Sequence, residues 1–146
     1  YEEFSRRDAE GMVSAYADDV HFRDPVFPDL RGERARDMWR MICELGKDLE
    51  ITFGDVKADG DVGSAHWEAR YTFSATGRRV HNVIDARFRF AGGKIVEHVD
   101  SFDLWRWSGM ALGFPGKLLG WAPPLQNAIR KRAAKGLDAW RAKQGR

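Results

Sequence analysis

The sequence has 146 residues, of which 43% are hydrophobic and 32% are charged, a composition that fits one domain with one hydrophobic core. No segment approaches the roughly 18 apolar residues that a membrane-spanning helix needs, and the acidic start at Tyr1 to Phe4 does not have the pattern of a signal peptide. The single cysteine, Cys43, excludes an internal disulfide, so the sequence predicts a cytoplasmic protein.

Charge is unevenly distributed along the chain. The net charge is +2, but residues 106–146 contain nine Lys or Arg and one acidic residue, Asp138, and therefore carry +8. Residues 1–105 must then carry −6, because the two parts sum to +2. The basic part either contacts an anionic partner or packs against the acidic remainder of its own chain. Nucleic-acid binding is not predicted, because no recognition motif accompanies the basic residues.

The first third of the chain predicts two helices with a short strand between them. A helix from Asp8 to about Ala17 has its apolar residues on one face, and Asp8 is a typical N-cap. Residues 21–23 read as a short strand that ends at Asp24-Pro25. A second helix spans about residues 33–45, with apolar residues at helical spacing, and the following glycine ends it.

The middle of the chain changes to the two-residue period of strands. Residues 49–58 form one strand, and residues 62–75, 79–91 and 94–104 form an antiparallel meander with turns at Thr76-Gly77 and Gly92-Gly93. Helices followed by a run of antiparallel strands indicate an α+β fold.

The pattern changes again after Leu104. A Trp-rich segment interrupted by glycines is followed by a basic amphipathic helix from Pro123 to about Lys143. We therefore divide the chain into a domain at residues 1–104 and a helical extension at residues 105–146 that packs on this domain.

Two segments resemble the SnoaL-like and ketosteroid isomerase-like branch of the nuclear transport factor 2-like superfamily. The first is YADDVHFRDP at 16–25 with LRG at 30–32, and the second is VIDARF at 83–88 with GKIVEHVD at 93–100. The resemblance covers about residues 4–104. It implies a cystatin-like cone in which a curved antiparallel sheet wraps over N-terminal helices and encloses a pocket. It further implies a homodimer, a small apolar, oxygen-bearing ligand and no cofactor.

The same resemblance implies roles for four residues. In ketosteroid isomerases the Asp before the proline is the base, which corresponds to Asp24, and a protonated Asp donates a hydrogen bond to the enolate oxygen, which corresponds to Asp85. The position of the tyrosine that assists this Asp in the family falls just before Tyr1, so Tyr1 is one residue out of register. In SnoaL-like cyclases a Glu-His-aromatic-Asp run supplies a basic Asp, which matches Asp100, although valine replaces the aromatic residue. His98 would then orient Asp100.

The register of the meander gives a separate expectation. If Gly92-Gly93 forms a two-residue turn, Asp85 lies opposite Asp100, Arg87 opposite His98 and Val83 opposite Phe102. The preceding turn places Glu68 opposite Asp85. One sheet face then gathers the ionisable side chains, which are His66, Glu68, Arg70, His81, Asp85, Arg87, His98 and Asp100.

Strand alternation and the family resemblance predict different surroundings for this ionisable face. Alternation alone leaves it in water and buries the opposite, apolar face. The resemblance instead turns Asp85 and Asp100 toward the pocket. In that case a homodimer partner or the Trp-rich segment after Leu104 has to cover the apolar face.

Three functions remain open on the sequence. An enzyme could remove a proton beside a carbonyl of the ligand, with Asp24 or Asp100 as the base and Asp85 as the donor. A non-catalytic module could bind a ligand or fill the pocket with its own side chains. Its C-terminal helix would contact a protein or, less favoured by the pattern, an anionic membrane surface. Thirdly, Glu68 or Asp100 could hold a lytic water, because Glu68-Ala69-Arg70 with Asp100 weakly resembles, in reversed order, the Asp-Arg-Asp set of limonene epoxide hydrolases.

Besides these groups, eight residues are expected to contact the ligand, namely Phe22, Trp39, Glu68, Arg70, His81, Val83, Arg87 and Phe102. A metal held by His81, Asp85, His98 and Asp100 is not favoured, because these residues lack a recognisable ligand spacing.

Overall fold

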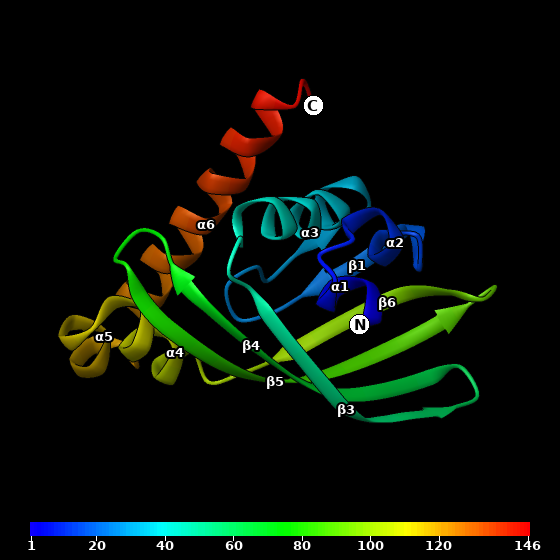
Figure 1. Ribbon diagram of the computed structural model, residues 1–146, viewed down its shortest axis with the longest axis horizontal. Coiled ribbons are helices and arrows are strands. Elements are labelled where there is room, and N and C mark those ends of the chain that lie inside the picture. Colours follow the sequence, from blue (N-terminus) through cyan, green and yellow to red (C-terminus); the bar gives the residue numbers. More distant parts are fainter.

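A curved six-stranded sheet carries helices on one of its faces in the computed structural model, which describes residues 1–146 (Figure 1). The helices are α1 (Glu2–Ser5), α2 (Ala9–Val13), α3 (Glu33–Leu45), α4 (Leu104–Leu112), α5 (Phe114–Leu119) and α6 (Pro123–Lys143). The strands are β1 (Tyr16–Arg23), β2 (Leu30–Arg31), β3 (Glu50–Asp59), β4 (Val62–Phe73), β5 (Arg78–Ala91) and β6 (Lys94–Ser101). The predicted α+β class is confirmed. None of the helices combines the length and the apolar character needed to cross a membrane.

The sheet has the strand order β2-β1-β6-β5-β4-β3. Strands β3 to β6 form the antiparallel meander that the two-residue period predicts. β1 is added parallel to β6, and the short β2 pairs with β1 at the edge. The predicted bounds of α3 agree with the structure, and Gly46 is its C-cap.

The predicted helix from Asp8 to about Ala17 is wrong in its second half. Asp8 does cap α2, because its carboxylate accepts a hydrogen bond from Gly11 N at 2.9 Å, but the helix ends at Val13. β1 then begins at Tyr16, well before the predicted strand. Tyr16 fits the helical period in sequence, yet its side chain is buried by contacts with residues distant in the chain. Tertiary packing therefore overrides the local pattern here.

A β-bulge in β6 makes the predicted register of the last hairpin wrong. Phe90 lies opposite Ile95, as a two-residue turn requires, but Arg89 lies opposite Glu97. The extra residue, Val96, moves every later position of β6 to the other face of the sheet. His98 consequently pairs with Phe88 and Asp100 with Ala86, instead of with Arg87 and Asp85.

The apolar face of the sheet is its inner face, and the chain's own helices cover it. Trp67, Ile84 and Ala86 belong to a core of 15 buried residues that also contains Trp39 of α3. A second, smaller core forms where α4 packs on the other end of the sheet, and it consists of Val80, Leu104, Trp107 and Ala111. Part of the Trp-rich segment thus covers one end of the apolar face, which is one of the two coverings expected from the sequence.

The basic helix α6 packs against α3 (Figure 1). Leu137 is 0% exposed at this contact, and the indole N–H of Trp140 donates to Glu44 at 3.0 Å. The carboxylate of Asp37, also 0% exposed, accepts hydrogen bonds from Arg40 at 2.9 Å, from Arg141 at 2.9 Å and from Arg146 at 2.5 Å. Burial alone would raise the pKa of this carboxyl, but the arginines outweigh that effect and lower it.

Candidate active site

A continuous chain of hydrogen bonds crosses the core between α3 and the sheet. Trp39 donates its indole N–H to the hydroxyl of Tyr16 at 2.7 Å, and that hydroxyl lies 2.6 Å from Nδ1 of His98. Nε2 of His98 lies 2.8 Å from Oδ1 of Asp100, which also accepts the indole N–H of Trp67 at 3.3 Å. All five residues in this chain of hydrogen bonds are at most 6% exposed. Such a buried, satisfied network holds its members in fixed orientations.

The chemistry of the end groups sets the direction of the protons in this chain. An indole only donates, and an ionised carboxylate only accepts. With Asp100 ionised, His98 carries its proton on Nε2 and donates it to Asp100. Nδ1 then accepts the hydroxyl proton of Tyr16. The order Asp–His–hydroxyl is that of the hydrolase triads, with a phenol in the place of the serine.

Aromatic rings hold the imidazole of His98 in place. Its ring centroid lies 4.5 Å from that of Phe88 and 5.0 Å from that of Phe22, and it stacks on Trp39 at 5.9 Å with an interplanar angle of 10°. These contacts leave the ring little freedom to rotate. Phe22 and Trp39, both expected to line the pocket, therefore support the imidazole from within the core.

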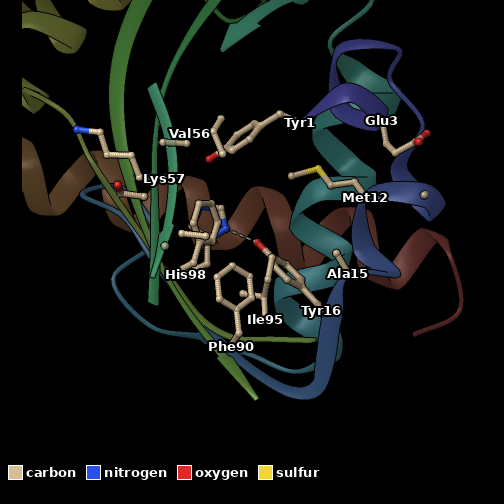
Figure 2. Close-up of a pocket in the computed structure, with 16 residues that line it drawn as sticks. Tyr1, Glu3, Met12, Ala15, Tyr16, Val56, Lys57, Phe90, Ile95 and His98 are labelled. Carbon is tan, nitrogen blue, oxygen red and sulfur yellow. Dashed lines mark hydrogen bonds between the residues drawn. The ribbon is translucent and has the colours of Figure 1, made fainter. Parts of the chain in front are cut away.

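A cavity of about 240 Å³ lies between α1, α2 and the sheet (Figure 2). Tyr16 and His98 line it together with apolar side chains that include Met12, Phe90 and Ile95. Glu3 and Lys57 are its charged lining residues. The bulge in β6 is essential to this arrangement, because Ile95 before the bulge and His98 after it both face the cavity.

Tyr1 extends into the same cavity (Figure 2). Its ring packs against Phe53 at 5.6 Å, Trp67 at 5.7 Å and Phe88 at 6.1 Å between centroids. Its hydroxyl is the one buried side-chain polar atom of the structure without a hydrogen-bond partner. Burial, the charge of Asp100 and the neighbouring Tyr16 raise the pKa of Tyr1, so the hydroxyl stays neutral and remains a donor.

Tyr16 is also held in its neutral form. Burial is the main cause that raises its pKa, and the charge of Asp100 adds to it, whereas the hydrogen bond from Trp39 acts in the opposite direction. The cavity therefore presents two neutral phenols, one bonded to His98 and one without a partner.

Asp24 lies just after β1 and forms a turn. Its Oδ1 accepts hydrogen bonds from the backbone N–H groups of Val26 at 2.7 Å and Phe27 at 2.6 Å. Burial raises the pKa of the Asp24 carboxyl to about 7, and the charge of Asp100 contributes to the rise, although the two N–H donors lower it. Asp24 does not line the cavity, and its predicted role as a base stays a prediction.

Five of the predicted site residues, Glu68, Arg70, His81, Asp85 and Arg87, lie on the outer face of the sheet. The side chain of Asp85 is 79% exposed and lies 3.0 Å from His66. It has none of the apolar surroundings that keep a carboxyl neutral, so the expectation that it faces the pocket beside Asp100 is wrong. Glu68 pairs on this outer face with His66 at 3.0 Å and His81 at 2.6 Å.

Because these residues lie on opposite faces of the sheet, neither the predicted water-activating set nor the set of possible metal ligands comes together. Glu68 and Arg70 lie across the sheet from Asp100, so the three residues do not form one water-activating site. Likewise His81 and Asp85 cannot converge on one metal ion with His98 and Asp100. Alternation was right for Asp85, whereas the resemblance was right that Asp100 faces inward.

Two further residues expected to contact the ligand lie outside the cavity. Val83 is on the outer face, opposite Glu68. Phe102 packs between the two hydrophobic cores. Three residues of the site, Tyr1, Tyr16 and Trp67, were not assigned to it from the sequence. The two-residue period does place Trp67 on the inner face, but only the bulge brings Asp100 to it.

The matching family model is that of the SnoaL-like domain, over residues 1–98. Since this match covers more than half of the sequence, the chain belongs to the SnoaL-like domain family, and the resemblance drawn from its motifs is confirmed. No curated protein matches the chain.

Solved structures of similar shape include NTF2-like proteins, a protein provisionally assigned as a polyketide cyclase and an epoxide hydrolase. IdmH from Streptomyces antibioticus, provisionally assigned as a polyketide cyclase, is 24% identical with a TM-score of 0.60, over 73% of this chain and 88% of its own. An LEH-like epoxide hydrolase from M. tuberculosis is 20% identical with a TM-score of 0.60, over 85% and 87%. An NTF2-like protein of unknown function from Burkholderia pseudomallei is 22% identical with a TM-score of 0.60, over 70% and 84%. At these identities the comparisons establish the fold.

Proposed function

We propose that this SnoaL-like protein binds a small, apolar, carbonyl-bearing molecule in the cavity and removes a proton from the carbon beside the carbonyl. The observation that carries the proposal is the buried Tyr16–His98–Asp100 chain, which ends at the cavity wall. The apolar lining suits an apolar ligand, and a proton acceptor at its surface suits general base catalysis. The chemistry is that of an isomerase or a cyclase.

In the proposed step Tyr16 relays the proton. Its hydroxyl oxygen takes the proton from the ligand carbon as its own proton passes to Nδ1 of His98, 2.6 Å away. The concerted transfer avoids a free phenolate, which the raised pKa of Tyr16 disfavours. The electron pair of the broken C–H bond moves to the carbonyl oxygen and forms an enolate. Asp100 stabilises the imidazolium, and return of the proton to another carbon completes an isomerisation, whereas attack of the enolate carbon on a second carbonyl completes a cyclisation.

Tyr1 supplies the donor for the developing negative charge. A buried hydroxyl without a partner costs free energy, about 1–3 kcal/mol for a typical group. A ligand oxygen that accepts its proton would remove this cost, and the bond would strengthen as the oxygen becomes an enolate. This assignment gives Tyr1 the role that the resemblance implied for Asp85.

The rival function is a non-catalytic binding module. One observation favours it: every polar atom of the Trp39–Tyr16–His98 segment already has a partner inside the protein. In this rival function the closed network fixes the core and takes no part in chemistry. The two functions differ in whether a bound ketone exchanges its acidic protons.

A model ketone separates the two functions. We would follow the exchange of the α-protons of 2-tetralone in D₂O by NMR, and measure its binding from chemical-shift changes of the protein. The proposal expects Tyr16→Phe and His98→Gln to lower the exchange rate by about 100-fold or more. Tyr1→Phe should lower it by a similar factor, as the loss of one oxyanion donor does.

Tyr71→Phe is the matched control, because Tyr71 is also a phenol bonded to an indole, that of Trp107 at 2.8 Å, but lies outside the cavity. Its exchange rate should equal that of the native protein. Exchange that survives Tyr16→Phe would refute the relay. Binding of the ketone without any exchange would establish the binding module instead.

A further inference from the structure

Helix α5 and its neighbours expose a group of large apolar side chains at one end of the molecule. We call them the α5 patch: Trp105, Phe114, Leu118, Leu119 and Trp121, which are 48%, 74%, 56%, 48% and 57% exposed. The two tryptophans contact α5 directly, because Trp105 bonds to the carbonyl of Lys117 and Trp121 to that of Leu118. Most of the large hydrophobic residues that the protein exposes are therefore gathered around one short helix.

Close packing through glycines forces these side chains outward. A Cβ atom on Gly116 would lie 1.9 Å from the carbonyl oxygen of Ser108 in α4, and one on Gly120 would lie 2.0 Å from its Oγ. The backbone of α5 thus contacts α4 directly, and its only buried residue is Gly116. No room is left between the two helices for Phe114 or Leu118, so their exposure follows from the packing.

The polar atoms of the patch are already satisfied. The indole N–H of Trp105 donates to Lys117 O at 2.9 Å, and that of Trp121 donates to Leu118 O at 3.0 Å. Transfer of the two rings out of water would therefore leave no indole N–H without a partner. A surface that loses water at so little polar cost is suited to an apolar environment.

Two positively charged side chains lie beside the patch. Lys117 lies within α5, and it lines, with Arg106, Trp105 and the N-cap residue Asp103, an open groove of about 370 Å³ between α4 and α5. These two basic side chains are complementary to an anionic surface, and they belong to residues 106–146, which carry +8, whereas residues 1–105 carry −6.

We propose that the α5 patch inserts into the surface of an anionic lipid membrane and that Lys117 and Arg106 contact the lipid phosphates. Tryptophan, phenylalanine and leucine beside lysine and arginine are the residues that anchor interfacial segments. The sequence suggested a membrane contact through the basic helix α6, but α6 covers α3, and the structure assigns the contact to α5. The proposal is independent of the chemistry in the cavity.

Vesicle co-sedimentation tests the insertion. Vesicles of phosphatidylcholine with phosphatidylglycerol should sediment the protein, and vesicles of phosphatidylcholine alone should do so much less. The double variant Phe114→Ser/Leu118→Ser should lower the partition coefficient by about tenfold or more. Lys117→Gln should lower it by about fivefold. Brominated lipids should quench tryptophan fluorescence in the native protein but not in the double variant.

The control is Leu45→Ser, which removes a side chain that is 64% exposed at the end of α3, away from the patch. It should sediment as the native protein does, and thermal unfolding should show that all variants are folded. Failure of the native protein to sediment, or equal sedimentation of the double variant, would overturn the proposal. A third outcome would also overturn it: neither the native protein nor the double variant binds vesicles, and light scattering detects a native dimer that the double variant lacks. The patch would then bind a second copy of the chain.

Discussion

Replacing Asp24 by Asn should stabilise the protein above neutral pH. The asparagine oxygen can still accept the hydrogen bonds from Val26 and Phe27, so the turn is preserved. What the substitution removes is the need to ionise a carboxyl in a place that disfavours its charge. Burial, the main cause, holds the pKa of this carboxyl at about 7 in the folded chain, against an ordinary value of 3.8.

The size and sign of the effect follow from linkage. A folded-state pKa above the unfolded one means that the folded protein binds more protons between about pH 4 and pH 7, so stability falls as pH rises through this range. The shift corresponds to at most about 4 kcal/mol at 1.36 kcal/mol for each pH unit. Below pH 4 the carboxyl is protonated in both states, and the two proteins should then be equally stable apart from small local effects. Above pH 7 the variant should be more stable by up to that amount.

Urea unfolding followed by circular dichroism at pH 4, 6 and 8 measures the difference. Asp19→Asn, at an exposed position on β1, the strand that precedes Asp24, controls for the loss of one negative charge. A difference between native protein and Asp24→Asn that is the same at all three pH values would refute the reasoning, since Asp24 would then ionise as it does in the unfolded chain.

Two further predictions concern the C-terminal extension. Asp37→Ala should lower the free energy of unfolding by about 2 kcal/mol near neutral pH, because three partly exposed arginines lose their buried partner. The loss should shrink below about pH 4, since the pKa of Asp37 is lowered in the folded state. Urea unfolding measures this loss, and the control is Asp138→Ala, which removes an exposed ion pair with Arg34. Gly116→Ala should lower stability by about 1–3 kcal/mol and speed tryptic cleavage after Lys117, because the added methyl group meets the backbone of α4, whereas Gly54→Ala, with open space around it, should do neither.

Local pattern was sufficient for most of the fold. The bounds of α3 and α6 follow from helical spacing together with their glycine and proline signals, and the meander follows from two-residue alternation and turn residues. The start of β1 does not follow from the local pattern. Tyr16 satisfied the period of a helix, and only its partners Trp39 and His98, distant in sequence, determine that it lies on a strand.

The site could be predicted only in part, because its geometry depends on the bulge at Val96. A turn of two glycines fixes the register near the turn, and nothing in the following residues signals that it shifts by one. The resemblance predicted correctly that Asp100, with His98 beside it, faces inward. It predicted the same for Asp85, which lies on the outer face. Its 79% exposure follows from plain alternation along β5.

The inserted valine in β6 also determines how this chain can be compared with others. If Val96 paired regularly with Arg89 instead of bulging, the residues that follow would exchange faces, and Glu97 and Val99 would point inward in place of His98 and Asp100. An ungapped alignment with a relative that lacks the bulge would then match inward residues of one protein with outward residues of the other. A change from bulged to regular pairing in the last strand can thus replace the inward His98 and Asp100 by a different lining while the composition of the strand is kept.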